Sequence, residues 1–388
     1  MTTISRPLRV LHVPDTVGGH PPALAAIERR HGLNSWCVGF GGSFVNYRAD
    51  ERVKTTGIHR LLLPCHRARL LWRAFNDFDV IHFNFGTTLM PMRKNLASRG
   101  PGLVKEILGR VYNAAASLVE FRDLAWLKRA GKVIAVTMQG DDARLWGWCR
   151  ENFKYTPAKE IDMSTRAEND DIVRCRLREF GRWADVIYSL NPDLMHGMPE
   201  RSQFFPYAHP DVTEWHYRGV DTGTDRPLQI VHAPTNRLIK GTKYLIAALD
   251  QLKREGLRFE LRLVEDLSNA EARRAYEESD VLVDQLLVGW YGGVAAELMA
   301  LGKTVVCYLR EGDFRFLPQE MAASLPIINA NPDTIAAVLR QIIQMPRTKL
   351  AEIGRNSRDW VERWHDPNAI GERVKADYLA AIEARSGR

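Results

Sequence analysis

Short apolar runs and longer segments with helical spacing alternate along most of the chain. Apolar runs bounded by polar residues predict buried parallel strands, because strands that are covered on both faces consist largely of Val, Ile and Leu. Segments with apolar residues three and four positions apart predict helices. In the first half, the predicted strands span residues 8–13, 35–40, 79–84, 132–137 and 185–190, and the predicted helices span 21–31, 67–75, 102–128 and 170–183.

A second alternation of strands and helices begins at Leu228 and ends at Tyr308. Each of its strands runs into a polar turn, and the carboxyl ends of parallel strands lie at one edge of a sheet, where open α/β sheets bind ligands. The charged residues in these turns are Arg237, Lys240, Asp266, Asp284 and Glu311. Residues 333–344, 350–364 and 368–384 predict three further helices, the last of which follows an Asp-Pro pair.

The length of the chain and a turn-rich stretch predict two α/β domains. A chain of 388 residues exceeds the size at which a single hydrophobic core usually keeps growing. Residues 203–227 are dense in turn-forming residues and separate the two alternations. Residues 151–165 show no clear period and predict a loop or a lid.

Composition excludes several classes of protein. The chain is 45% hydrophobic and 26% charged, which is typical of a globular protein. Its five cysteines are widely spaced and without a CxxC pair, which argues against a disulfide framework or a structural zinc and favours a reducing compartment. The first residues lack a signal-peptide pattern, and no apolar run approaches the roughly 20 residues of a membrane-spanning helix. We therefore expect a cytoplasmic protein, soluble or peripherally attached to the inner face of the membrane.

A formal charge of +7 is compatible with nucleic acid, an anionic membrane or an anionic substrate as partner. Residues 92–130 hold eight Lys and Arg against three Asp and Glu, and their apolar residues recur at helical spacing. Two interpretations stay open: a helix packed on its sheet with a solvated basic face, or a surface helix that lies on anionic lipid. Nucleic acid is disfavoured because no known nucleic-acid-binding signature is present.

Two groups in the second half carry candidate chemistry. Gly292 and Gly293 open a predicted helix, whose first amide groups can face a phosphate, and Glu297 about one turn later can accept hydrogen bonds from a ribose diol. Arg237 and Lys240 follow a strand end and suit a diphosphate leaving group, whose departure requires charge neutralisation. The alternative for the two glycines is that they only allow close packing. The alternative for Arg237 and Lys240 is that they form a solvated basic turn without a ligand.

These segments resemble the nucleotide-sugar-binding domain of GT-B glycosyltransferases, particularly the retaining family 4 type. NRLIKGTKYLIAAL matches a strand, an arginine-to-KG turn and a helix, and GWYGGVAAELMALGKTVVCY matches the glutamate-bearing helix and strand that follow. In the first half, Gly18 and Gly19 match a glycine loop, and MQGDDAR resembles an HGSD-like segment. The resemblance implies the GT-B fold, with two Rossmann-like α/β domains (1–207 and 208–366) facing across a cleft and a C-terminal helix (367–388) returning toward the first domain.

The resemblance also implies site residues. Arg237, Lys240, Gln139 and Asp141 would form the catalytic set, and His82, Asp142 and Trp146 are candidates for acceptor binding. No metal or cofactor is implied, since the donor phosphate itself is thought to act as the base in such retaining enzymes. The implied donor-binding residues are Gly18, Gly19, Arg237, Lys240, Asp284, Tyr291, Gly292, Gly293 and Glu297.

The sequence departs from the family pattern at three places. The first glutamate of the paired motif falls on Gly289, and Asp284 is the nearest carboxylate that can substitute. The histidine of the HGSD-like segment is Gln139, which can donate and accept hydrogen bonds but cannot act as an acid or base. Arg237 is closer to Lys240 than the arginine of the family usually is.

The leading hypothesis is a retaining, metal-independent glycosyltransferase that moves a sugar from a nucleotide diphosphate sugar to a glycan or lipid-linked acceptor in surface-polysaccharide or glycolipid assembly. The departures at Gly289 and Gln139 motivate a second hypothesis, a catalytically silent GT-B protein that binds a nucleotide sugar. A sugar-nucleotide epimerase is a third. A dehydrogenase is disfavoured, because no GxGxxG follows the first strand.

Overall fold

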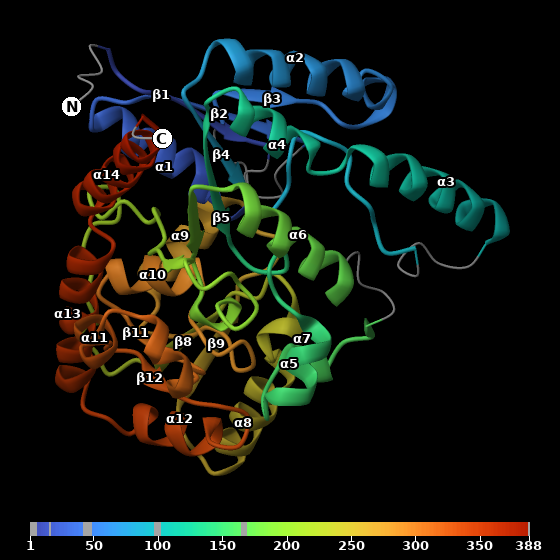
Figure 1. Ribbon diagram of the computed structural model, residues 1–388. Coiled ribbons are helices and arrows are strands. Elements are labelled where there is room, and N and C mark those ends of the chain that lie inside the picture. Colours follow the sequence, from blue (N-terminus) through green and yellow to red (C-terminus); the bar gives the residue numbers. More distant parts are fainter. Residues whose placement is uncertain (1–5, 15–16, 42–48, 97–101, 164–168, 387–388) are drawn as a thin grey trace. The chain divides into compact units, whose positions relative to one another are not determined.

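A computed structural model describes residues 6–14, 17–41, 49–96, 102–163 and 169–386 of the chain (Figure 1). The chain divides into two compact units. The first contains Met1–Trp148, Asp162–Ala208 and Pro367–Arg388, and the second contains Cys149–Ile161 and His209–Asp366. The break that the sequence predicts between residues 207 and 208 lies one residue before the break at Ala208. The segment Cys149–Ile161, which the prediction leaves in the first domain, belongs to the second unit.

The first unit is built on a seven-stranded sheet in which every neighbouring pair is parallel, in the order β3-β2-β1-β4-β5-β6-β7. The five strands predicted from apolar runs are all present, with ends within two residues of the prediction. The short strands β3 and β7 carry too few residues to show a period. The strands are β1 (Arg9–Val13), β2 (Asn34–Phe40), β3 (Glu51–Val53), β4 (Val80–Asn84), β5 (Val133–Met138), β6 (Val186–Ser189) and β7 (Gln203–Phe204).

Helices cover this sheet and contribute to a core that includes Leu11, Ile81 and Phe180. The single helix predicted over residues 102–128 is instead two, because Phe121 adopts a left-handed conformation with φ of 60° and its side chain enters the core. The helices are α1 (His20–Arg30), α2 (Leu63–Asn76), α3 (Leu103–Val119), α4 (Arg122–Arg129), α6 (Asp170–Trp183) and α14 (Pro367–Ser386). The chain passes from the first unit to the second within α5 (Trp146–Asn152).

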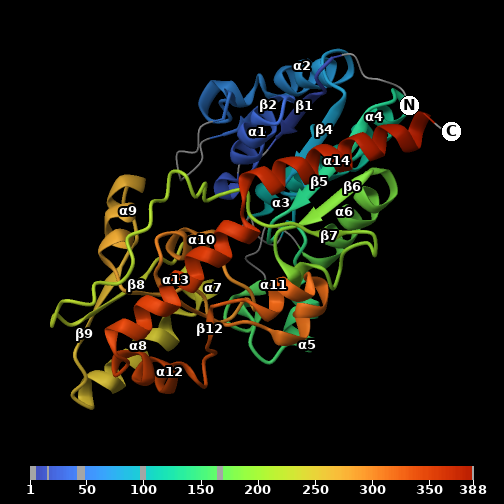
Figure 2. The same ribbon diagram turned by 90° about the vertical axis from the view of Figure 1, so that its left-hand side faces the viewer.

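The C-terminal helix α14 runs beside α1 in the first unit (Figures 1 and 2). A buried polar network fixes it there. The Tyr378 hydroxyl donates to Glu28 Oε1 over 2.9 Å and lies 2.6 Å from His82 Nδ1, while His12 Nε2 lies 2.9 Å from Glu28 Oε2. Because all four side chains are buried, an unpaired member would be costly, so the network specifies where the helix docks.

The second unit has a five-stranded parallel sheet in the order β12-β11-β10-β8-β9. Its core joins residues of the strands and helices, among them Ile230, Leu249 and Val306. The strands are β8 (Leu228–His232), β9 (Phe259–Leu263), β10 (Val281–Val283), β11 (Thr304–Cys307) and β12 (Ile328–Asn329). The helices are α7 (Arg237–Lys240), α8 (Thr242–Arg254), α9 (Asn269–Glu278), α10 (Gly293–Ala300), α11 (Gln319–Ala323), α12 (Ile335–Ile343) and α13 (Arg347–Trp364).

Candidate functional site

The carboxyl end of β8 leads into α7, a single helical turn that the Asn236 side chain caps by accepting from the amides of Leu238 and Ile239. Gly241 follows with φ of 75°, a left-handed conformation that favours glycine and allows α8 to begin at once. His232 connects the end of β8 to β10 and α8, since its ring nitrogens lie 2.7 Å from the Val283 carbonyl oxygen and 2.8 Å from Thr242 Oγ1. Burial lowers the pKa of His232 to about 4, so the imidazole is neutral.

Lys240 and Asp284 form a buried ion pair at the ends of α7 and β10. Lys240 Nζ donates to Asp284 Oδ1 over 2.5 Å, and their side chains are 10% and 1% exposed. The other carboxylate oxygen of Asp284 accepts from the Gly292 amide over 2.6 Å. Asp284 therefore fixes the segment that opens α10. It occupies the Gly292 amide and one of the three donors of the Lys240 ammonium, so Lys240 is held beside this carboxylate.

The glycine pair at the start of α10 meets packing requirements. A Cβ on Gly292 would lie 3.2 Å from Lys240 Nζ, and one on Gly293 would lie 2.6 Å from His209 Nε2. Burial lowers the pKa of His209 to about 4, so a neutral ring contacts the helix start. Close packing, the alternative that the sequence left open, thus accounts for both glycines.

Glu297 lies on the second turn of α10 and is half-buried. Its carboxylate makes no hydrogen bond or ion pair with any residue that the structure describes. Burial raises its pKa to about 8, and the more distant charge of Arg273 opposes that shift only in part. Above that pKa the ionised carboxylate is an acceptor without a donor among the described residues, and hydroxyl groups of a ligand can supply one; below it the group is a neutral acid.

Arg237 behaves differently from Lys240. Its guanidinium forms a two-point ion pair with Glu265, and its side chain is 58% exposed. Exposed ion pairs typically contribute at most about 1 kcal/mol, so Arg237 can exchange Glu265 for a phosphate at little cost. The two cations that the sequence grouped together therefore differ: Arg237 can move to a ligand, whereas Lys240 is held in the interior.

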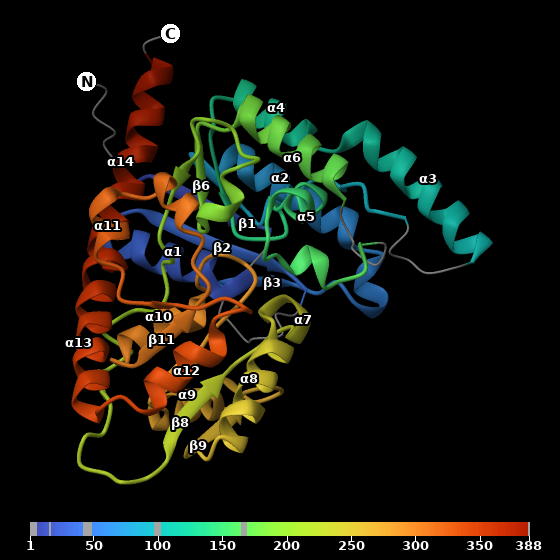
Figure 3. The ribbon, with the colours of Figure 1, turned by 90° about the horizontal axis from the view of Figure 1, so that it is seen from below.

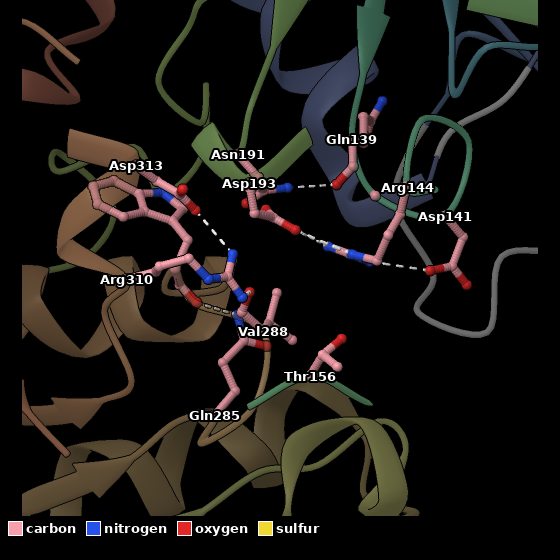
Figure 4. A network of polar contacts seen from close by, with 12 residues as sticks. Gln139, Asp141, Arg144, Thr156, Asn191, Asp193, Gln285, Val288, Arg310 and Asp313 are labelled. Atoms are coloured by element: carbon pink, nitrogen blue, oxygen red, sulfur yellow. Dashed lines mark hydrogen bonds and ion pairs between the residues drawn. The ribbon is translucent and has the colours of Figure 1, made fainter. Parts of the chain in front are cut away.

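Gly289, which replaces the first glutamate of the family pattern, has φ of 97°. A Cβ there would lie 2.8 Å from Arg310 Cζ. The Arg310 guanidinium stacks 3.4 Å from the centre of the Phe153 ring and bonds to the Asp313 carboxylate and the Val288 carbonyl oxygen (Figure 4). Arg310 thus occupies the space that a side chain at position 289 would need.

In the first unit, the Gly18-Gly19 turn lies at the carboxyl end of β1, and both glycines have positive φ values, of 65° and 72°. The Gln139 side chain faces this turn, since its Oε1 lies 3.6 Å from where a Cβ of Gly18 would be. Gln139 Nε2 is buried and makes no hydrogen bond with any described residue. This amide is a donor without an acceptor beside a turn that lets a ligand approach the backbone.

The segment after β5 is held by interactions within the first unit (Figure 4). Buried Asp142 accepts from the amides of Gln139 and Gly140, and Asn191 donates to the Gln139 carbonyl oxygen over 2.6 Å. Arg144 donates to Asp193 over 2.8 Å and to the more exposed Asp141 over 3.1 Å. Asp141 and Asp142 thus position the turn.

Three residues that were predicted to contact a ligand are buried in this structure. His82, Trp146 and Tyr291 are each at most 1% exposed, so none presents its side chain to a ligand in this structure. His82 lies in the α14 network, where burial holds its pKa well below the usual range. The Tyr291 hydroxyl lies 2.9 Å from His365 Nε2. Trp146 and Tyr291 were predicted as aromatic faces for a sugar and His82 as a histidine on a strand, but all three pack inward.

The sequence showed no metal-ligand spacing, yet the structure brings His12, Glu28 and His82 together. One ligand atom from each lies within 4.8 Å of the others. These atoms are used in the buried network with Tyr378 that docks α14, and those hydrogen bonds account for the cluster. The residues come from β1, α1 and β4, so only the parallel register of the two strands reveals their proximity.

The fold of the chain matches solved glycosyltransferase structures over nearly its whole length. Sucrose-phosphate synthase from Thermosynechococcus elongatus superposes with a TM-score of 0.58 at 15% identity, covering 98% of this chain and 100% of that chain. Anabaena HepE, solved with UDP and glucose, superposes with a TM-score of 0.56 at 14% identity, covering 96% of this chain and 100% of that chain. A glycosyltransferase from Rickettsia africae superposes with a TM-score of 0.54 at 10% identity, covering 97% of this chain and 99% of that chain. The chain has the GT-B fold.

This result confirms the fold class that the sequence predicted. No protein-family model and no curated protein matches the sequence itself. At these identities the similarity establishes the fold, and the chemistry of the site has to be argued from the residues of this chain.

Sequence reasoning missed Glu265, Arg144, Asp193 and Arg310, which set the charge balance of the two sheet edges. A usable signal existed for Asp193, because it follows β6 by four residues, at the same edge as the predicted Gln139 segment. Arg310 follows β11 in the same way. Each acts through partners that only the tertiary structure reveals.

Proposed function

We propose that the chain is a glycosyltransferase that moves a sugar from a nucleotide diphosphate sugar to a glycan or lipid-linked acceptor in the assembly of surface polysaccharide or glycolipid. The GT-B fold supports the proposal, since transferases with this fold match nearly the whole chain. The observation that carries it is the unpartnered carboxylate of Glu297 at the carboxyl edge of the second sheet.

Glu297 is the proposed ribose contact. A ribose diol offers two hydroxyl donors to a carboxylate that has no donor in the unliganded chain, and hydrogen bonds to charged groups contribute about 1.5–3 kcal/mol each. Asp284 and Lys240 hold the opening of α10 rigid and so fix the direction of the helix that carries Glu297. A contact that is preorganised in this way loses little entropy on binding.

Arg237 is the proposed diphosphate contact. Its exchange of Glu265 for the donor phosphates would place a cation where negative charge develops as the sugar leaves. In the first unit, the Gln139 amide is the proposed donor to a ligand oxygen. The reaction is proposed to be retaining and independent of metal and cofactor, with the donor phosphate as base, in line with the resemblance to family 4.

The proposed partners include an anionic surface at the inner face of the membrane, to which a cytoplasmic enzyme would attach to reach a lipid-linked acceptor. The basic character of residues 92–130 supports this part.

Titration calorimetry with the full chain tests the donor site. The ligands are nucleoside diphosphates with the common bases, their sugar conjugates and the matching nucleosides. Above pH 8, where Glu297 is ionised, we expect Glu297→Gln to weaken the binding of nucleosides and of nucleoside diphosphates alike by about 10- to 100-fold, the equivalent of one charged hydrogen bond. Arg237→Ala should weaken the binding of the nucleoside diphosphates and leave the binding of the nucleosides unchanged.

The matched control is Glu372→Gln, the same change at an exposed position of α14, which should alter no affinity. The proposal is wrong if no nucleotide or nucleotide sugar binds at millimolar concentration, or if the Glu297 and Glu372 variants bind alike.

One observation favours a second candidate, a GT-B protein that binds a nucleotide sugar without turning it over. Arg310 fills the space at Gly289 where the family pattern has a glutamate that contacts the donor sugar. If a nucleotide sugar binds tightly yet no nucleotide is released in the presence of many acceptors, this candidate replaces the transferase.

A further inference from the structure

Helix α3 of the first unit exposes most of its apolar side chains. It extends away from the sheet of that unit (Figures 1 and 3), and the two buried residues in it are the small Gly109 and Ala116. Within the parts of the chain that the structure describes, no helix combines the length and hydropathy needed to cross a membrane. Six large apolar side chains of α3 are each more than half exposed: Leu103, Val104, Ile107, Leu108, Val111 and Leu118.

These six side chains form one continuous stripe. At about 100° per residue they fall within roughly 140° of the helix circumference. Gly109 and Ala116 lie on the opposite side, so the helix contacts its own unit through small residues and turns its apolar stripe outward. This arrangement rules out the packed-helix interpretation for α3, because a packed amphipathic helix buries its apolar face.

The next helix provides an internal contrast. In α4, Leu124 and Leu127 are fully buried in the core of the first unit. Both helices come from one continuous amphipathic pattern in the sequence, and in the structure they are separated by Glu120, which is not helical, and the left-handed Phe121. A contiguous stripe of this size on a surface usually marks an interaction site.

The charges around the stripe favour anionic lipid as the occupant. Arg110 lies about 20° beyond one edge of the stripe, and Lys105 lies about 60° beyond the other, just past Tyr112. Both are exposed, as are Lys94, Arg122 and Arg129 on the adjoining segments. Glu106 is the one acid of the helix, and its ion pair with Arg110, 2.6 Å long, is exposed on both sides, so Arg110 can exchange it for a lipid phosphate at little cost. Cations that flank an apolar stripe are the pattern of helices that lie in a membrane interface, where they reach the lipid phosphates.

We propose that α3 is a membrane-docking helix that lies in the plane of an anionic bilayer interface. Its 17 residues give a length of about 25 Å, and the apolar stripe enters the acyl boundary while Arg110 and Lys105 contact lipid phosphates. This proposal rests on the membrane partner of the proposed function and names the surface that meets it. Every residue that carries it belongs to the first unit, so its failure would leave the proposed donor site of the second unit untouched.

Vesicle flotation with the full chain tests this surface. We expect the wild-type chain to float with phosphatidylcholine vesicles that contain 30% phosphatidylglycerol, to bind pure phosphatidylcholine at least tenfold more weakly, and to lose part of its binding in high salt. Ile107→Asp/Val111→Asp should reduce binding to the anionic vesicles at least 100-fold, because two inserted side chains are replaced by charges. Lys105→Glu/Arg110→Glu should reduce it about tenfold or more.

The matched control is Leu267→Asp, the same kind of change at an exposed apolar residue of the second unit, which should leave flotation unchanged. Because all these positions are exposed, the variants should keep the melting temperature and the nucleotide affinity of the wild type. Equal binding to both kinds of vesicle, or equal flotation of the Ile107/Val111 and Leu267 variants, would overturn the proposal. So would light scattering that shows a dimer which the Ile107/Val111 variant abolishes, since a second copy would then cover α3.

Discussion

The carboxyl edges of the two sheets use their polar groups in similar ways and leave different ones unpaired. In the first unit, Arg144 pairs with Asp193, and Asp142 caps the turn after β5. In the second, Lys240 pairs with Asp284, which also caps the start of α10. In both units a buried cation–carboxylate pair fixes a turn at the end of a strand.

The polar groups that stay unpaired at the two sheet edges differ in chemistry. The first edge leaves the Gln139 side-chain amide without an acceptor among the described residues, and the second leaves the Glu297 carboxylate without a donor. Buried polar groups are normally hydrogen-bonded, so the buried Gln139 amide nitrogen points to an external partner, while the half-buried Glu297 carboxylate is open to one. The comparison teaches that charge alone does not identify a ligand contact; the absence of an internal partner does.

The largest expected effect concerns the paired groups. Lys240→Met leaves Asp284 buried without its cation, and loss of one partner of a buried pair typically costs about 3–5 kcal/mol. We expect the second unit to unfold at lower urea concentration, and hydrogen exchange should show the loss of protection in its peptides and not in those of the first unit.

Lys243→Met is the control for this prediction. Lys243 lies three residues further on, is 58% exposed and pairs with Glu160, so its loss should change the free energy of unfolding by less than about 1 kcal/mol. Equal effects of the two substitutions would mean that Lys240 is not a structural cation, and the distinction from Arg237 would fail.

A smaller effect is expected at Gly289. Alanine there must adopt φ of 97° and displace the Arg310 guanidinium, for which we expect a loss of about 2–3 kcal/mol in the free energy of unfolding. Gly312→Ala is the matched control, because a Cβ at that position meets nothing within 4 Å. Thermal unfolding followed by circular dichroism separates the two, and a Gly289 variant as stable as the Gly312 variant would show that Arg310 does not fill this space.

The sequence predicted the fold well because buried parallel strands are continuous apolar runs. The five long strands of the first sheet all lie within two residues of prediction, whereas the two-residue strand β7 offered no pattern. The break at Phe121 was not predictable, since phenylalanine is an ordinary helix residue and only its place in the core makes the left-handed turn favourable.

The sequence predicted the region of the candidate site but not the contacts of its individual residues. The rule that strand ends meet at one edge grouped Lys240 with Asp284, and Glu297 was proposed separately from its place one turn after the glycine pair. The sequence could not show that Lys240 and Asp284 pair across 44 positions while Glu297 has no partner, because pairing depends on tertiary contacts. For the same reason Tyr291 and His82 read as ligand contacts although they are interior residues.

The unpaired carboxylate gives the subtlest prediction, a pH dependence of nucleotide affinity. Burial raises the folded-state pKa of Glu297 from its ordinary 4.5 to about 8, so its contribution to stability is fully present below pH 4.5 and is lost as pH rises through 8. Ribose hydroxyls donate to the ionised form, so the affinity for a nucleotide should rise between pH 6 and 8, by at most about tenfold per pH unit. Glu297→Gln cannot ionise and should show neither this rise nor the fall in stability. Calorimetry at several pH values measures the nucleotide affinity of the wild type and of the variant. Parallel dependence of the two affinities on pH would mean that another group accepts the hydrogen bonds of the ribose.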